Sequence, residues 1–229
     1  MFMRIAIIGA SGQTGLQLID AALARGHSVI GLARTPAKIK RQDPGLVVRQ
    51  ADIFDADSLI AGLASADAVL TSVGKTNLRE KTPPFNTTSH RNILAAMQAN
   101  NIRRIVAISS FGAARGVRRK GLRRKIYLFL RRQYYGDMGA MEQMLLDADV
   151  GATVVRAPML HNREARSDWL LTDDGSLPAG NAISRADLAE YLIGELETGT
   201  STGHIVAVAD EGELSLPFSE LRPPRPDAQ

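Results

Sequence analysis

The stretch that most constrains the fold is a glycine loop near the N-terminus. A short β-branched run, Arg4–Ile8, leads directly into Gly9-Ala10-Ser11-Gly12-Gln13-Thr14-Gly15, and an apolar stripe at helical spacing follows. Gly9 permits a tight turn, Gly12 lets backbone amides approach a diphosphate, and Gly15 lets the helix pack close to the strand. In this strand–turn–helix context the loop predicts a dinucleotide site at a helix N-terminus. The residues of the loop expected to contact the cofactor are Gly9, Ser11, Gly12, Gln13, Thr14 and Gly15.

Further strand-like and helix-like segments alternate along the chain. The expected strands are Arg4–Ile8, Ser28–Leu32, Leu46–Arg49, Ala68–Ser72, Arg104–Ser109, Ala152–Arg156 and Ile205–Val208. The expected helices are Thr14–Arg25, Ser58–Ala64, Thr88–Asn100, Met138–Ala148 and Ser184–Leu196. Such alternation predicts an α/β fold with a doubly wound, mainly parallel sheet. Residues 111–135 and 158–183 do not fit this pattern, and both follow strands where a parallel sheet places its ligand-facing loops.

Composition narrows the classes of protein. The 229 residues suffice for one domain, which we place at 1–221, and the proline-rich residues 222–229 are expected to form a flexible tail. No apolar run approaches the roughly 20 residues of a membrane span. The start of the chain is interpreted as a strand and not as a signal peptide. Cysteine is absent, which suits a reducing cytoplasm, and the four histidines show no zinc-ligand spacing.

The net charge of +4 hides an uneven distribution. Between Lys81 and Gly136 there is no acidic residue, whereas thirteen basic residues occur there. The remainder of the chain has a net charge of −9. One side of the molecule is therefore expected to attract anions.

The end of the second strand bears on the choice of dinucleotide. NAD-binding units usually place Asp or Glu there to bind the ribose 2′-hydroxyl, but this chain has Arg34. A guanidinium pairs bidentately with a 2′-phosphate, and Lys38 adds a second positive charge. The sequence therefore favours NADP over NAD, although Arg34 in solvent at the strand end is the alternative.

The next two strands offer further contacts to the cofactor. Asp52 and Ile53 follow the third strand and are candidates for holding the adenine; alternatively, Asp52 begins a turn or caps the next helix. After the fourth strand, Val73 and Gly74 let the backbone pass close to a ribose.

These residues together resemble a known family. The glycine loop, Arg34, Ala51-Asp52-Ile53 and Val106-Ala107-Ile108-Ser109-Ser110 are similar to the atypical short-chain dehydrogenase/reductases, most of all to the NmrA-like and flavin (biliverdin) reductase B-like branch. Supporting segments are 153–158 and 183–189, and the resemblance covers about residues 3–208. It implies a Rossmann-type core, a small C-terminal substrate region around residues 158–183, and NADPH-dependent reduction. Some relatives bind NADP only to sense redox state.

One catalytic pattern of the wider family is missing. Short-chain dehydrogenases usually use Tyr-x-x-x-Lys, in which Lys lowers the pKa of the phenol. The residues four places after the four tyrosines here are Arg131, Met138, Gly139 and Glu195. The flavin reductase branch also lacks this pair, and it has a Ser at the position of Ser110. It has a His after the sixth strand, where this chain has Pro158-Met159, and His161 lies nearby.

Without that tyrosine, hydride transfer relies on the cofactor and on positioning groups. Ser109 and Ser110 end a central strand, and they are the candidate catalytic residues that would face the nicotinamide or the acceptor; the alternative is a hydroxyl that bonds the backbone. Flavin- or quinone-like acceptors are favoured because their delocalised anionic products need little help from a protein acid. The rival hypothesis is an NADP(H)-binding sensor without turnover.

The basic segment 118–132 has several interpretations. Apolar residues at helical spacing are flanked by Arg and Lys, which is typical of a surface helix with a solvated basic side. It could instead cap an anionic small-molecule acceptor or contact an anionic membrane surface. Nucleic acid is not expected, because the aromatic spacing of an RNA-stacking surface is missing. The sequence does not give the oligomeric state.

Overall fold

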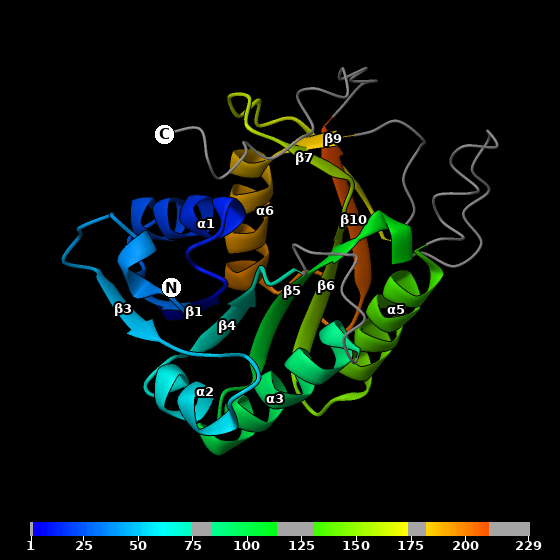
Figure 1. Cartoon of the computed structure of the whole chain (residues 1–229). Helices are drawn as coiled ribbons and strands as arrows, with labels where there is room; N and C mark the ends of the chain where they lie inside the picture. Colours follow the sequence, from blue (N-terminus) through cyan, green and yellow to red (C-terminus); the bar gives the residue numbers. More distant parts are fainter. Residues whose placement is uncertain (1, 75–83, 114–130, 174–181, 211–229) are drawn as a thin grey trace.

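The computed structural model describes residues 2–74, 84–113, 131–173 and 182–210 (Figure 1). Within them, the main sheet has eight strands in the order β3-β2-β1-β4-β5-β6-β10-β8. Their bounds are β1 Arg4–Ile8, β2 Ser28–Ala33, β3 Leu46–Gln50, β4 Ala68–Thr71, β5 Arg104–Ser110, β6 Gly151–Ala157, β8 Trp169–Thr172 and β10 Ile205–Asp210. Neighbouring strands pair in parallel except β8, which is antiparallel to β10.

The strand order reverses direction next to β1. From β1 the chain builds β2 and β3 on one side, and then it crosses to β4, β5 and β6 on the other. The gap between the β1 and β4 crossovers is the topological switch point of a doubly wound sheet, where such folds bind ligands beyond the carboxyl ends of the strands. The predicted α/β, Rossmann-type, mainly parallel fold is confirmed.

Helices cover both faces of the sheet (Figure 1). One apolar core contains α1 (Gln13–Ala24) and α6 (Arg185–Thr198), and the other contains α2 (Ala56–Leu63), α3 (Phe85–Ala99) and α5 (Arg132–Asp147). Along β1, Ile5 and Ile7 enter the first core, while Ala6 and Ile8 enter the second. All four side chains are buried. Because the strand is covered on both faces, its sequence is apolar throughout and does not alternate with polar residues.

In the C-terminal half of the chain, the observed elements differ from the predicted ones in two places. Residues 158–183, expected to be a loop, contain β7 (Met159–His161) and β9 (Ala182–Ser184), which form a separate parallel pair, as well as β8. Strands of three or four residues are too short to show a period of two, so their pattern is lost in the sequence. Helix α5 begins at Arg132 and not at Met138, because tertiary contacts of its first turns override the weak helix propensity of Tyr134, Tyr135 and Gly136.

Short 3₁₀ turns follow β2 (η1, Pro36–Lys38) and β5 (η2, Phe111–Ala113). Of the basic segment 118–132, only Arg131 and Arg132 are described, so the predicted helix there lies outside the described residues, as does the tail 222–229. In the described part of the chain, no helix combines the length and apolar character needed to cross a membrane.

Candidate functional site

The glycine loop connects β1 to α1 at the carboxyl edge of the sheet. Gly9 has φ +86°, a left-handed conformation that side chains rarely adopt, and a Cβ there would lie 3.0 Å from Ser72 Oγ. The N–H groups of Gly9 and Ala10 both donate to the Leu32 carbonyl, at 3.2 and 3.1 Å. These bonds fix the turn against the end of β2, which brings the loop next to the strand that carries Arg34.

Gly15 lies where the loop and the first turn of α1 come closest together. A Cβ at this position would lie 2.3 Å from the Gly9 carbonyl oxygen and 2.7 Å from Ala10 Cα. Both are backbone atoms that cannot rotate away. Close packing of helix on loop therefore requires glycine here, as the sequence predicts.

The N-terminus of α1 has the features of an anion site. Its N-cap, Gly12, makes no side-chain capping bond, and the first turn contains no acidic residue. Among the described residues, no acceptor pairs with the backbone N–H groups of Ser11, Gln13 and Thr14. Free N–H groups at the positive end of a helix dipole bind phosphate, so this cradle fits the diphosphate of a dinucleotide.

The end of β2 places two cations near the loop. Arg34 follows Ala33 directly, and Lys38 ends η1; both are exposed. Arg34 makes no ion pair with any residue in the described ranges, whereas Arg41 pairs with Asp20 and Asp43 at 3.3 and 3.4 Å. Within the described residues Arg34 is thus a cation without a counter-ion, in the place where a 2′-phosphate is expected.

The remaining residues that we expect to contact the cofactor lie just after β3 and β4. Asp52 Oδ1 accepts from the Phe54 N–H at 3.0 Å, so Asp52 begins a turn, and Asp55 is the residue that caps α2. Ile53 and Val73 both pack against the core of α2 and α3, while Gly74 is exposed. The contacts of Asp52, Ile53, Val73 and Gly74 with a cofactor stay predictions.

The two serines that end β5 differ in their surroundings. Ser109 is buried, and its hydroxyl donates to Glu142 Oε1 at 2.5 Å. Ser110 is half-buried, and its Oγ accepts from the Gly112 N–H at 3.2 Å, while its own proton has no acceptor among the described residues. The predicted roles at the reacting groups stay predictions, but of the two serines only Ser110 keeps a donor that no described residue uses.

The carboxylate that holds Ser109 was not among the predicted residues. Glu142 lies in α5, and Arg156 of β6 pairs with it through two bonds, Nε to Oε1 at 2.9 Å and Nη2 to Oε2 at 2.7 Å. A signal was present in the sequence. Glu142 falls on the inward face of α5 with Met138, Met141 and Leu145, and Arg156 interrupts a buried strand. Two opposite charges at core positions indicate a pair.

A second buried network lies under the end of β4. Asp137 of α5 accepts from the backbone N–H groups of Asn86 and Thr87 at 2.7 and 3.1 Å, and so it caps the N-terminus of α3 from outside that helix. One turn further, His90 contacts the Asn86 carbonyl through Nδ1 at 2.9 Å and Thr71 Oγ1 through Nε2 at 3.4 Å. Burial lowers the pKa of His90 to about 4.

The remaining candidates for proton transfer differ in their burial. His161 is buried, and its Nε2 contacts Asp210 at 2.9 Å while its Nδ1 accepts from the Arg163 N–H. Tyr134 packs in the apolar core of α3 and α5, and Tyr127 lies outside the described residues. Burial raises the pKa of Tyr191, midway along α6, to about 12.

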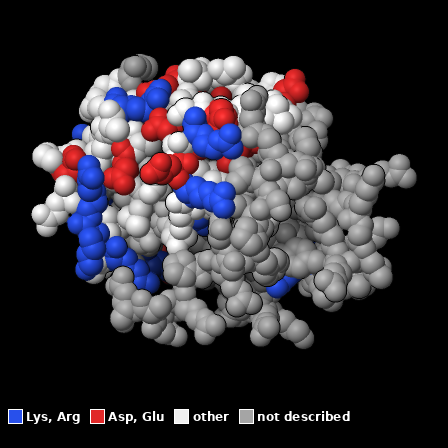
Figure 2. Space-filling view, turned by 90° about the horizontal axis from the view of Figure 1, so that it is seen from above, with Lys and Arg blue, Asp and Glu red and all other residues white. Residues whose placement is uncertain are grey.

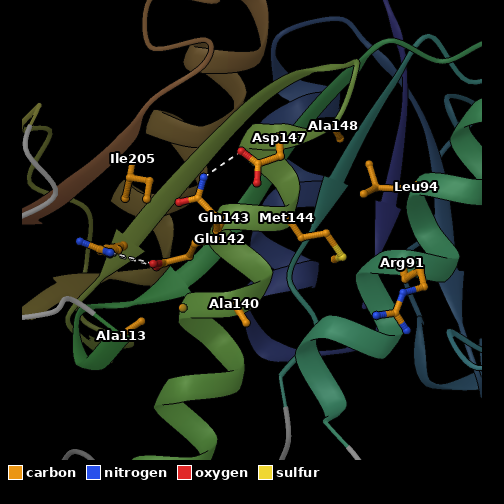
Figure 3. A pocket seen from close by; sticks show the side chains of 12 residues that line it. Arg91, Leu94, Ala113, Ala140, Glu142, Gln143, Met144, Asp147, Ala148 and Ile205 are labelled. Atoms are coloured by element: carbon orange, nitrogen blue, oxygen red, sulfur yellow. Dashed lines mark hydrogen bonds and ion pairs between the residues drawn. The ribbon is translucent and has the colours of Figure 1, made fainter.

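A cavity of about 1130 Å³ lies around α5, and Glu142 and Arg156, the group that holds Ser109, are among its lining residues. Figure 3 shows Arg91 and Leu94 of α3 on one flank of α5, and Glu142 with Ala113 and Ile205 on the other. None of the predicted cofactor-binding residues lines it. The candidate site is therefore the carboxyl edge of the sheet and not this cavity.

A family model described as NAD(P)H-binding matches residues 9–198, which begin at the glycine loop and end in α6. The chain belongs to this family. Its sequence is 28% identical over 223 residues to an uncharacterised protein of Mycobacterium bovis, covering 93% of this chain. The chain spans about a fifth of the length of this and the other first curated relatives, 22% in this case.

Solved structures support the same fold. A short-chain dehydrogenase/reductase of Veillonella parvula in complex with NADP superposes with a TM-score of 0.76 and 18% identity, covering 94% of this chain and all of that one. An anaerobilin reductase of Escherichia coli O157:H7 superposes with a TM-score of 0.77 and 16% identity, covering 93% of this chain and all of that one. The expected NAD(P)H-binding family and the Rossmann-type fold are thus confirmed.

Proposed function

We propose that this member of the NAD(P)H-binding family prefers NADPH and uses it to reduce a small conjugated acceptor of the flavin or quinone kind. The observation that carries the choice of cofactor is Arg34, which follows the strand that holds the diphosphate loop and has no counter-ion in the part of the chain that the structure describes. A bidentate guanidinium–phosphate pair contributes about 1.5–3 kcal/mol. That range corresponds to a preference of roughly 10- to 100-fold for NADPH over NADH.

The residues that would hold the cofactor follow the carboxyl edge from β2 to β5. The N–H groups at the start of α1 would bind the diphosphate, Arg34 and Lys38 the 2′-phosphate, and Asp52 with Ile53 the adenine. Val73 and Gly74 would lie along a ribose. Bound there, a reduced nicotinamide supplies a hydride.

In this proposal the chain's own groups position the acceptor near Ser110. Because the Gly112 N–H satisfies one lone pair of Ser110 Oγ, the hydroxyl is oriented, and its proton, which no described residue accepts, can be donated to a carbonyl of the acceptor or of the nicotinamide carboxamide. Ser109 instead donates to Glu142, which is locked by Arg156, so its proton has a partner already. A weak donor of this kind suits an acceptor whose reduced form delocalises its negative charge, which is the reason for proposing flavins and quinones.

Two measurements test the proposal. Fluorescence titration should show tighter binding of NADPH than of NADH, and Arg34→Glu should weaken NADPH binding at least tenfold while sparing NADH. Arg41→Gln is the matched control, because it removes an exposed arginine close in sequence that already pairs with Asp20 and Asp43. Equal affinities of the native protein for the two cofactors would contradict the role of Arg34.

Turnover is followed by the loss of the absorbance of reduced nicotinamide in the presence of flavins and quinones. Oxidation of NADPH that falls severalfold in Ser110→Ala supports the reductase. Tight NADPH binding with no oxidation across the panel would favour the second candidate, a sensor of NADP(H) without turnover. The observation on this chain that favours the sensor is the burial of His161 and its contact with Asp210, which make this histidine unsuited to donate a proton to an acceptor.

A further inference from the structure

Arg185 and Asn162 meet just beyond the ends of the β7–β9 pair. His161 pairs with Ser184 in the parallel register, so the next residues, Asn162 and Arg185, both leave the carboxyl ends of these strands. Arg185 Nη1 donates to Asn162 Oδ1 at 2.7 Å. Arg185 is also the first residue of α6. The two side chains therefore form one polar corner at the start of that helix.

This corner lies on the same edge as the diphosphate loop. Helices α1 and α6 pack side by side (Figure 1). Arg25, which follows the last residue of α1, donates to Glu197 near the end of α6. Gln13 starts α1 after the carboxyl end of β1, and Arg185 starts α6 after the carboxyl end of β9, so both helix starts follow the carboxyl ends of strands. Seen from above, the described part of this face carries basic and acidic side chains interspersed (Figure 2).

Arg185 differs from Arg104 and Arg156, two other half-buried arginines, because neither a carboxylate nor, as for Arg49, a set of backbone carbonyls holds it among the described residues. Arg104 pairs with Glu195 at 2.9 Å and Arg156 with Glu142 at 2.7 Å. Within the described ranges no carboxylate pairs with Arg185, and burial alone lowers its pKa. A partly desolvated cation without a partner is costly, so it is retained most readily where a ligand supplies the missing charge.

The guanidinium also has an unused donor. Because Nη1 is engaged by Asn162, the N–H groups of Nε and Nη2 remain, and Nε is buried without an acceptor. Because the protein encloses Nε, Nη2 is the nitrogen without an acceptor among the described residues that could donate a charge-assisted hydrogen bond to a carboxylate or phosphate. The nearest acid in sequence, Asp187, is fully buried and accepts from the Arg166 and Ser167 N–H groups and the Ser184 hydroxyl. Asp187 is therefore occupied elsewhere.

We propose that Arg185, held by Asn162, binds an anionic group of the acceptor, either a carboxylate or a phosphate. This inference rests on the proposed reductase function, because it assigns the anion to the molecule that is reduced. It makes Arg185 a specificity-determining residue: the conjugated ring lies toward Ser110, and the anionic substituent reaches the start of α6. Charged acceptors are then preferred over neutral ones with the same ring.

The test compares matched acceptors with NADPH as the donor. FMN and riboflavin share a ring and differ in a phosphate, while biliverdin and its dimethyl ester differ in two carboxylates. We expect a lower KM for the charged member of at least one pair, and the pair that shows it identifies the anion. Arg185→Gln should raise that KM about 10- to 100-fold, the range for a charge-assisted hydrogen bond, and leave the KM of the neutral member unchanged. Arg185→Lys should have an intermediate effect, since it keeps the charge and loses the guanidinium geometry.

Arg103→Gln is the control for loss of one positive charge, because Arg103 is exposed and lies at the opposite end of β5 from Ser110. Circular dichroism of each variant verifies folding. An unchanged preference for the charged member in Arg185→Gln would overturn the proposal. A loss of NADPH affinity with that preference intact would also overturn it, and would assign Arg185 to the cofactor. If the native protein reduces neither pair, the proposed reductase function is wrong. The anion site is then tested separately, by comparing the binding of FMN and of riboflavin through quenching of flavin fluorescence in the presence of NADP.

Discussion

Acid should destabilise this protein through His90, which is buried beside the end of β4. The Asn86 carbonyl can only accept, so His90 Nδ1 carries the proton and Nε2 accepts from Thr71. A second proton would have to go to Nε2 in a fully buried site. Burial lowers the pKa of His90 from 6.5 to about 4, although the nearby Asp137 raises it in part.

The sign and size of the effect follow from proton linkage. Between pH 6.5 and 4 the unfolded chain binds a proton at this histidine and the folded protein does not. Stability from neutral burial is therefore complete above pH 6.5 and is lost as the pH falls toward 4. A shift of this size corresponds to a loss of about 3 kcal/mol in the free energy of unfolding.

Urea unfolding at pH 7, 6, 5 and 4 measures this loss, with His90→Gln as the comparison because glutamine retains an amide donor for the Asn86 carbonyl. The urea midpoint of the native protein should fall more steeply with pH than that of the variant, at similar m-values. Glu197, whose pKa is lowered by Arg25, loses its own contribution at the acid end in both proteins, so it cancels in the difference. Equal pH dependence in the two proteins would refute the assignment.

Two further variant pairs test the packing described above. Gly15→Ala places a Cβ about 1 Å inside normal contact with the Gly9 carbonyl, so it should lower stability by about 1–3 kcal/mol and abolish NADPH binding. In the control variant Gly194→Ala, in α6, the new Cβ meets nothing within 4 Å, so thermal unfolding should show a gain in stability of up to about 1 kcal/mol. A Gly15→Ala variant that is stable and binds NADPH would contradict the proposed role of the loop in binding the diphosphate. Arg104→Met leaves Glu195 buried without its ion-pair partner, so it should lower the free energy of unfolding in urea by about 3–5 kcal/mol. The double variant Arg104→Met with Glu195→Met should recover much of this loss. If the losses of the two single variants simply add in the double variant, the two residues do not act as a pair.

The sequence predicts those parts of the molecule that depend on local rules. The seven expected strands and the phosphate loop form because β-branched runs and glycine spacing act over a few residues. The separate β7–β9 pair depends on contacts between residues more than 20 positions apart, and its strands are too short to carry a pattern. The Glu142–Arg156 pair and the missing counter-ion of Arg185 are likewise properties of packing. A sequence shows the charges, but it does not show which of them meet.

The cap that Asp137 provides for α3 has a consequence for how the protein tolerates change. Most helices depend for their first turn on the residue just before them, so alterations of the preceding connection are felt in the helix. Here the N–H groups of Asn86 and Thr87, in the first turn of α3, are held by a carboxylate 51 and 50 positions away, on a helix that packs alongside. The connection that precedes α3 therefore need not supply a capping residue. We expect its length and composition to vary among related chains while the start of α3 stays in place.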